Sequence, residues 1–96
     1  MPKAYRLGDL CTGHDSRKAT AAMESSEDVF VNGEGLVREG DAIEPHGCYN
    51  NDPTKRFLAT GSGSVFINGK PAARSGDPIS CGGFADLGSD DVYIGD

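Results

Sequence analysis

A repeated pattern constrains this chain more than any other feature of its sequence. Residues 25–33 end in Val-Phe-Val-Asn-Gly, and residues 61–69 end in Val-Phe-Ile-Asn-Gly. A shorter third copy, Val-Tyr-Ile-Gly, occupies residues 92–95. The first two copies are offset by 36 residues. Self-similarity at such a spacing is typical of folds built from repeated units. We therefore expect three similar units related by internal pseudo-threefold symmetry.

Each unit is predicted to be a strand, a tight turn and a second strand. The Asn-Gly pairs at residues 32–33 and 68–69 favour the left-handed angles of a two-residue type I′ hairpin turn. Because strand side chains alternate, Val29 and Val31 should face one side and Phe30 the other. No long window has the period of an amphipathic helix. The sequence therefore predicts an all-β fold of short strands and tight turns.

A Gly-Asp pair recurs beside these hairpins, at residues 8–9, 40–41 and 76–77. The glycine permits a sharp turn, and an Asp side chain can accept hydrogen bonds from backbone N–H groups two residues further on. We expect a structural role for Asp9, Asp41 and Asp77.

The composition allows one small domain with a thin core. Among the 96 residues, Leu, Ile, Val and Phe together supply 18, whereas glycine alone supplies 14. A chain of this size leaves roughly a third of its surface exposed even when folded. We expect residues 1–96 to form a single domain of marginal stability.

Charge and hydropathy exclude several classes of function. The net charge of −6 repels a phosphate backbone, and we find no basic patch, so nucleic acid is not an expected partner. No apolar run approaches the roughly 18 residues of a membrane-spanning helix, and residues 1–6 lack the apolar stretch of a signal peptide. We expect synthesis in the cytoplasm.

Side chains with metal affinity follow each Gly-Asp pair. His14, His46 and Cys81 occupy similar places after the first, second and third pairs. Symmetry-related positions converge near the axis of a pseudo-threefold fold, so these three side chains could meet there. Imidazole nitrogen and thiolate sulfur are the ligands of tetrahedral zinc. A thin core would gain much from such a metal, because structural zinc contributes on the order of 10–16 kcal/mol in small peptides.

The fourth ligand is open. Three cysteines cannot all pair within one chain, which leaves metal ligation or free thiols. Cys48 is the first choice because it lies beside His46, Cys11 is the second because it is close to His14, and water is the third. Cys11 could equally be a small buried apolar residue.

The residues also allow two rival functions. A small zinc hydrolase or toxin would use Glu44 as a general base if water were the fourth ligand, but so short a chain leaves little material for a pocket. An adaptor would tether effectors to a larger assembly through exposed loops such as residues 50–56. A nucleophilic enzyme has little support, because a His, a Cys and an Asp can be found in almost any sequence.

The residues resemble those of a known family. Pro-Ala-Ala-Arg at residues 71–74 is the motif for which the PAAR-repeat proteins are named, and it lies between the second Asn-Gly and the third Gly-Asp. Residues 6–9, 12–14, 45–47, 81–83 and 88–89 also follow the family pattern. The chain departs from it in two places: Thr54 stands where related sequences have a further histidine, and residues 35–38 read Gly-Leu-Val-Arg in place of a second Pro-Ala-Ala-Arg.

The resemblance implies a small conical PAAR fold and a mechanical function without an enzymatic activity. Members of the family cap and sharpen the trimeric β-helical spike of contractile injection systems, which are type VI secretion systems and phage tails. It implies one tip per trimer of valine-glycine repeat protein G or a phage homologue, transient contact with a target membrane, and a final location in the virion tail or outside the cell. It also implies that zinc, or iron in its place, is bound by His14, His46 and Cys81, and the missing histidine at Thr54 brings Cys48 into the ligand set.

Overall fold

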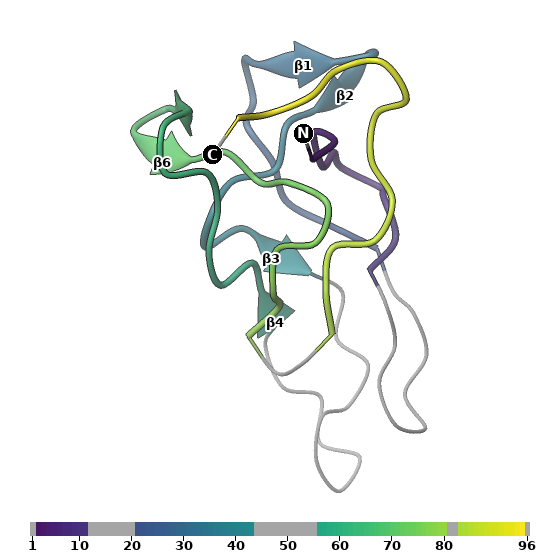
Figure 1. The fold of residues 1–96 in the computed structure, drawn as a ribbon, viewed down its shortest axis with the longest axis vertical. Coiled ribbons are helices and arrows are strands. Elements are labelled where there is room, and N and C mark those ends of the chain that lie inside the picture. The colour runs from purple at the N-terminus through teal and green to yellow at the C-terminus, as the bar shows by residue number, and fades with distance from the viewer. Residues whose placement is uncertain (1, 12–20, 44–55, 81–82, 96) are drawn as a thin grey trace, which may run out of the picture.

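The computed structural model describes residues 2–11, 21–43, 56–80 and 83–95. Within these ranges the secondary structure consists of two-residue strands: β1 (Phe30–Val31), β2 (Glu34–Gly35), β3 (Ala42–Ile43), β4 (Arg56–Phe57), β5 (Phe66–Ile67) and β6 (Lys70–Pro71). They form three antiparallel pairs, β1 with β2, β3 with β4 and β5 with β6 (Figure 1). The described part of the chain contains no helix, and hence none that could span a membrane. The expected all-β fold of short strands is confirmed.

Both predicted hairpins are present, and the Asn-Gly pairs make their turns. Asn32 and Gly33 join β1 to β2 with φ angles of 55° and 83°. Asn68 and Gly69 join β5 to β6 with φ angles of 55° and 80°. Positive φ at both central residues is what a type I′ turn requires, and Asn and Gly adopt it at low cost.

The predicted alternation of side chains is also confirmed. Val31 is buried in a cluster formed with Ala4, Leu36, Ala72 and Ile94, and Val29 packs against that cluster. Phe30, between the two valines, is 60% exposed. The other copies behave alike, with Phe66 56% and Tyr93 49% exposed while their neighbours face the cluster.

Residues 2–4 and 92–94 form a strand pair equivalent to the two hairpins. We call it the third hairpin, although no turn joins its two strands. Tyr93 pairs with Lys3, the Ala4 N–H donates to the Val92 C=O at 3.0 Å, and the Ile94 N–H donates to the Pro2 C=O at 2.9 Å. The same bond closes the other hairpins, from Leu36 to Val29 and from Ala72 to Val65. The third sequence copy is therefore a full structural unit, whose second strand comes from the N-terminus. Figure 1 shows both ends in the upper part of the view, where β1, β2 and β6 also lie.

A closed ring of backbone hydrogen bonds joins the three units. The Tyr5 N–H donates to the Ala73 C=O (3.2 Å), the Ala73 N–H to the Val37 C=O (2.9 Å), and the Val37 N–H to the Tyr5 C=O (3.0 Å). A second set of three bonds, each of 2.8 Å, runs beside it from Leu7 to Gly35, from Glu39 to Pro71 and from Ser75 to Lys3. Because every unit makes the same bond to the next, the expected pseudo-threefold symmetry is confirmed for the described residues.

The core below this ring is built from equivalent positions of the three units. One apolar cluster contains Tyr5, Val37 and Ala73 from the ring, and three pairs joined by β-bridges: Cys11 with Ala85, Ile43 with Ala22, and Ile79 with Leu58. The paired side chains differ in size between the units, from Cys11 with Ala85 to Ile79 with Leu58, so that three unequal units fill one space. Cys11 thus occupies the place that isoleucine holds in the other two units.

Candidate functional site

Of the cysteines and histidines considered as metal ligands, the structure describes Cys11. It is buried. Its equivalence to Ile43 and Ile79 in the apolar cluster favours the packing interpretation of this residue over ligation.

The remaining candidates, His14, His46, Cys48 and Cys81, lie outside the described residues, as do Glu44, Thr54 and residues 50–55. Within residues 2–11, 21–43, 56–80 and 83–95, no three His, Cys, Asp or Glu side chains come together in a way that could hold a metal ion. The ligand set predicted from the sequence stays a prediction.

The described residues do show how the segments with the candidate ligands are anchored. Cys11, Ile43 and Ile79 belong to one buried cluster. His14 follows Cys11 by three residues, His46 follows Ile43 by three, and Cys81 follows Ile79 by two. Three segments that carry metal-type side chains thus leave the described structure at equivalent places around one centre.

One polar feature, an Arg-Asp turn, occurs three times in the described residues. In the second unit, the Arg38 Nε and Nη2 atoms donate to the two carboxylate oxygens of Asp41, both at 2.9 Å. The backbone N–H of Arg38 donates to the same carboxylate at 2.8 Å, and the N–H of Asp41 returns to the Arg38 carbonyl at 3.0 Å. Such paired, charge-assisted bonds are among the strong hydrogen bonds of proteins.

The other two turns repeat this geometry. Arg6 pairs with Asp9 at 2.9 Å and Arg74 pairs with Asp77 at 2.8 Å. The intervening glycines, Gly8, Gly40 and Gly76, have φ angles of 88°, 89° and 93°, which turn the chain so that the carboxylate reaches back to the arginine.

The structural role expected for these aspartates is confirmed, but the expected hydrogen bonds were wrong. The carboxylates accept hydrogen bonds from backbone and guanidinium groups three residues earlier in the chain, because the glycine with positive φ turns the chain back toward the arginine. The Arg-x-Gly-Asp spacing at residues 6–9, 38–41 and 74–77 is the sequence signal that would have shown this pairing.

A serine opens each hairpin. The hydroxyl oxygen of Ser26 accepts hydrogen bonds from the N–H groups of Asp28 and Val29, at 3.2 and 3.0 Å. Ser62 and Ser89 do the same for the residues two and three positions later. All three serines are buried. Each hydroxyl holds the chain in the bend that leads into the first strand of its hairpin.

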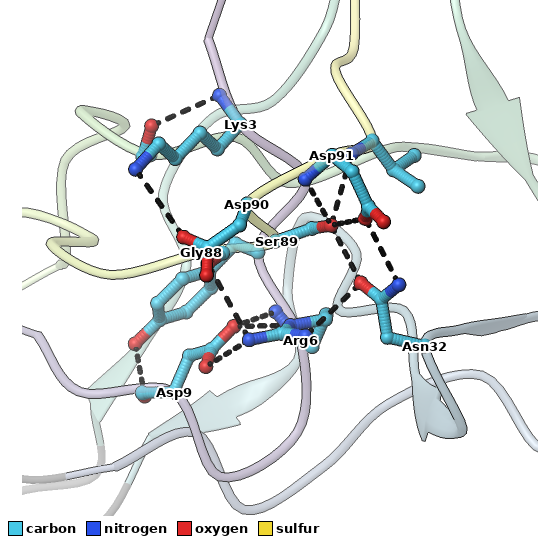
Figure 2. A network of polar contacts seen from close by, with 11 residues as sticks. Lys3, Arg6, Asp9, Asn32, Gly88, Ser89, Asp90 and Asp91 are labelled. Atoms are coloured by element: carbon cyan, nitrogen blue, oxygen red, sulfur yellow. Dashed lines mark hydrogen bonds and ion pairs between the residues drawn. The ribbon is translucent and has the colours of Figure 1, made fainter.

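Asparagines of the hairpin turns connect the serine bends to the arginines. Figure 2 shows one such network: the Arg6 Nη1 donates to the Asn32 Oδ1 at 3.1 Å, and the Asn32 Nδ2 donates to the Asp91 Oδ1 at 3.0 Å. The Ser89 hydroxyl lies between Asn32 and Asp91 and contacts both. The equivalent network joins Arg38, Asn68, Asp28 and Ser26. Each network binds three separate parts of the chain together.

The third corner, where the chain ends meet, is built differently. Ser62 occupies the serine position, but its hydroxyl donates to the Gly95 carbonyl at 2.9 Å. Ser64 stands in place of Asp28 and Asp91, and Gly95 in place of the turn asparagine. This corner therefore lacks the Asn-Asp contact of the other two.

These networks change the pKa values of their members. Hydrogen bonds from Asn68 and then Ser26 lower the pKa of Asp28 below its ordinary value of 3.8, and Asn32 and Ser89 do the same for Asp91. The hydrogen bond to Asp9 raises the pKa of Arg6, and the hydrogen bond to Asp41 raises that of Arg38. The charged forms of all four residues are therefore favoured.

The lowered carboxylate pKa values predict a dependence of stability on acid. Because the folded-state pKa of Asp28 and Asp91 lies below the unfolded value, their stabilisation is complete above about 3.8 and is lost as the pH falls through the folded-state pKa. We expect the melting temperature to fall on acidification from about pH 5 to about pH 2, and to fall less steeply in the double variant Asp28→Asn, Asp91→Asn. The control Asp90→Asn should keep the wild-type slope, and equal slopes in all three proteins would contradict the prediction.

The described polar groups act as structural elements. Every buried polar side-chain atom in the described part of the chain has a hydrogen-bond partner, and that part contains no pocket. The three Arg-Asp pairs hold turns in place, and the asparagine networks hold two of the corners. Sequence reasoning missed the serine bends and the asparagine networks, although the Ser-x-x-Val spacing before each hairpin marks the serines.

Comparison with known proteins points to one family. Residues 44–84 match the family model of the PAAR motif. This segment includes the β5–β6 hairpin, the third Arg-Asp turn and the candidate ligands His46, Cys48 and Cys81. No curated protein matches the chain.

Proposed function

This chain is a PAAR-repeat protein, and from that membership we propose that it caps and sharpens the end of a trimeric β-helical spike. The PAAR motif is that of the spike-tip proteins of contractile injection systems, and PAAR proteins associate with the spike formed by valine-glycine repeat protein G. We propose one tip per trimer, without an enzymatic activity of its own. It would reach the virion tail or the outside of the cell with the apparatus and contact the target membrane only transiently.

The closed ring of hydrogen bonds among Tyr5, Val37 and Ala73 is the observation that carries this proposal. It makes a single chain nearly threefold symmetric, so that one monomer can offer similar contacts to three identical subunits. A chain without this symmetry would match one subunit and mismatch the other two.

The proposal includes a metal ion held by His14, His46 and Cys81, with Cys48 as the fourth ligand and zinc ahead of iron. The donor set suits zinc, and the anchoring of the three segments at Cys11, Ile43 and Ile79 supports their convergence. The burial of Cys11 in the apolar cluster favours Cys48 over Cys11 as the fourth ligand, with water as the remaining alternative. The metal would supply rigidity by linking segments that the thin core cannot hold.

Native mass spectrometry tests both parts. The chain is mixed with trimeric valine-glycine repeat protein G from the same source, and we expect one complex with the mass of one chain, three subunits and about one zinc or iron ion. His46→Ala should lower the metal occupancy of the free chain below about half, whereas Asp15→Ala should leave it unchanged. A wild-type chain that stays unbound would overturn the cap, and a metal-free chain that folds would overturn the metal site.

A further inference from the structure

Within the described residues, three strand edges are left unpaired at the hairpin end of the molecule. In the first hairpin, the bond from the Leu36 N–H to the Val29 C=O makes these two residues a hydrogen-bonded pair. The next pair, Phe30 with Gly35, is then a non-hydrogen-bonded pair, so the N–H and C=O of Phe30 point away from β2. Within the described residues, β1 pairs with β2 alone. Figure 1 shows β1 outermost, with β2 beneath it.

The inner strand of each hairpin is occupied on both sides. The carbonyl of Gly35, on the side of β2 away from β1, accepts a hydrogen bond from the Leu7 N–H at 2.8 Å. Pro71 and Lys3 accept the equivalent bonds in the other hairpins. The bonds from Ala72 to Val65 and from Ala4 to Val92 likewise turn the backbone groups of Phe66 and Tyr93 outward. Three equivalent residues, Phe30, Phe66 and Tyr93, therefore each direct one backbone N–H and one C=O outward, where a strand of another chain could pair with them.

Each free edge also carries an exposed aromatic ring, on Phe30, Phe66 and Tyr93. Native proteins usually protect edge strands with charge, proline or a covering segment, because a bare edge pairs with other chains. An aromatic side chain at the same position in all three units adds contact area beside the free backbone groups. The three edges therefore have the features of a docking face.

The charge around this face is acidic. The bends and strands next to the edges carry five acidic side chains and two lysines. The acidic residues are Glu27, Asp28, Glu34, Asp90 and Asp91, and the lysines are Lys3 and Lys70. Arg6 and Arg38 are held by Asp9 and Asp41 and offer little free charge. A partner with basic side chains around its contact surface fits this distribution.

We propose that the edges at Phe30, Phe66 and Tyr93 dock the chain by strand addition onto a partner that ends in three equally spaced strand edges with basic side chains at its rim. The inference rests on the proposed function, because the end of a trimeric β-helix is the occupant with that symmetry. Each edge contributes one donor and one acceptor to a strand of one subunit, and its ring packs over that strand.

Variants at Phe66 separate the two contributions. Phe66→Ala removes the ring and keeps the N–H, whereas Phe66→Pro removes both. Because proline is tolerated on edge strands where the N–H faces solvent, the second variant should still fold, which circular dichroism would verify. Phe57→Ala is the matched control, since Phe57 is a phenylalanine of β4 that is 44% exposed and lies away from the three edges.

Binding to the immobilised trimer of valine-glycine repeat protein G is measured by surface plasmon resonance. We expect Phe66→Ala to weaken binding several-fold, Phe66→Pro to weaken it by at least about tenfold, and Phe57→Ala to bind like wild type. Added salt should weaken wild-type binding. If Phe66→Pro does not fold, the triple variant Phe30→Ala, Phe66→Ala, Tyr93→Ala replaces it, with an expected loss of at least about tenfold.

The outcomes separate this inference from the proposed function. A wild-type chain that does not bind the trimer overturns the proposed function and removes the occupant. A wild-type chain that binds, with edge variants that bind equally well, overturns strand addition and leaves the cap intact. Tight binding that salt does not change overturns the basic rim.

Discussion

Replacing Asp41 with alanine is expected to lower the free energy of unfolding by about 3–5 kcal/mol, because it leaves a largely buried guanidinium without its partner. The Asp41 side chain is 1% exposed and the Arg38 side chain 14% exposed. The carboxylate also accepts the backbone N–H of Arg38, which would lose its acceptor as well. For a domain of this size the loss corresponds to a decrease in melting temperature of roughly 12 °C or more, measurable by calorimetry.

The repeated turn provides graded controls for Asp41→Ala. The equivalent aspartate of the first unit, Asp9, is 12% exposed, so water can solvate part of what Asp9→Ala leaves behind, and we expect a smaller decrease. Asp90 is 99% exposed in its side chain, and Asp90→Ala should change the melting temperature little. If Asp41→Ala were no more harmful than Asp90→Ala, the Arg-Asp turns would not be a main source of stability.

The second large effect is expected at Gly61, where the hairpins pack against the bends. A Cβ atom added at Gly61 would lie 2.7 Å from the Ala72 carbonyl oxygen and 2.9 Å from that of Pro71. Both contacts are with backbone, which moves less readily than the end of a side chain, and the Cβ of Pro71 is a third close atom at 3.0 Å. We expect Gly61→Ser to lower the free energy of unfolding by about 1–3 kcal/mol, measured by urea denaturation.

The other units indicate how this cost can be reduced. Position 61 corresponds to Ser25 and Gly88, and the strand residue opposite is Gly35 in the first case and Lys3 in the second. A Cβ at Gly35 would collide with the side chain of Ser25, and one at Gly88 would lie 2.8 Å from the Cβ of Lys3. In each of the three units, one of the two facing residues is therefore a glycine.

A double-mutant cycle tests this compensation. We expect the pair Gly61→Ser with Pro71→Gly, which copies the Ser25 and Gly35 arrangement, to be more stable than the sum of the single changes by at least about 0.5 kcal/mol. Strict additivity of the two changes would show that the opposing glycine does not relieve the contact.

Local signals in the sequence were enough for the hairpins. Asn-Gly at residues 32–33 and 68–69 predicted the turns, since few residues adopt positive φ at low cost. The Val-Phe-Val alternation predicted which side chains are buried, because its period is set by the strand itself. The same reasoning assigned a structural role to Asp41 but placed its hydrogen-bond donors two residues later in the chain. They lie three residues earlier, because the φ of 89° at Gly40 decides where the carboxylate reaches.

The candidate site divides in the same way. The sequence identified His14, His46, Cys48 and Cys81 from residue type and spacing, and this ligand set stays a prediction. For Cys11 the sequence left ligation and packing open, and only its place in the cluster with Ile43 and Ile79 favoured packing. Burial depends on which segments surround a residue in the folded chain, and the residue type alone does not predict which segments these are.

The sequence by itself determined the repeat, the turns and the alternation of strands, since each depends on residues adjacent along the chain. Only the tertiary structure decided that Lys3 pairs with Tyr93 and that Tyr5, Val37 and Ala73 close a ring. Those contacts join distant segments through backbone groups that every residue shares, so no side-chain pattern announces them. They form because three units, none able to bury its own apolar face, bury those faces together.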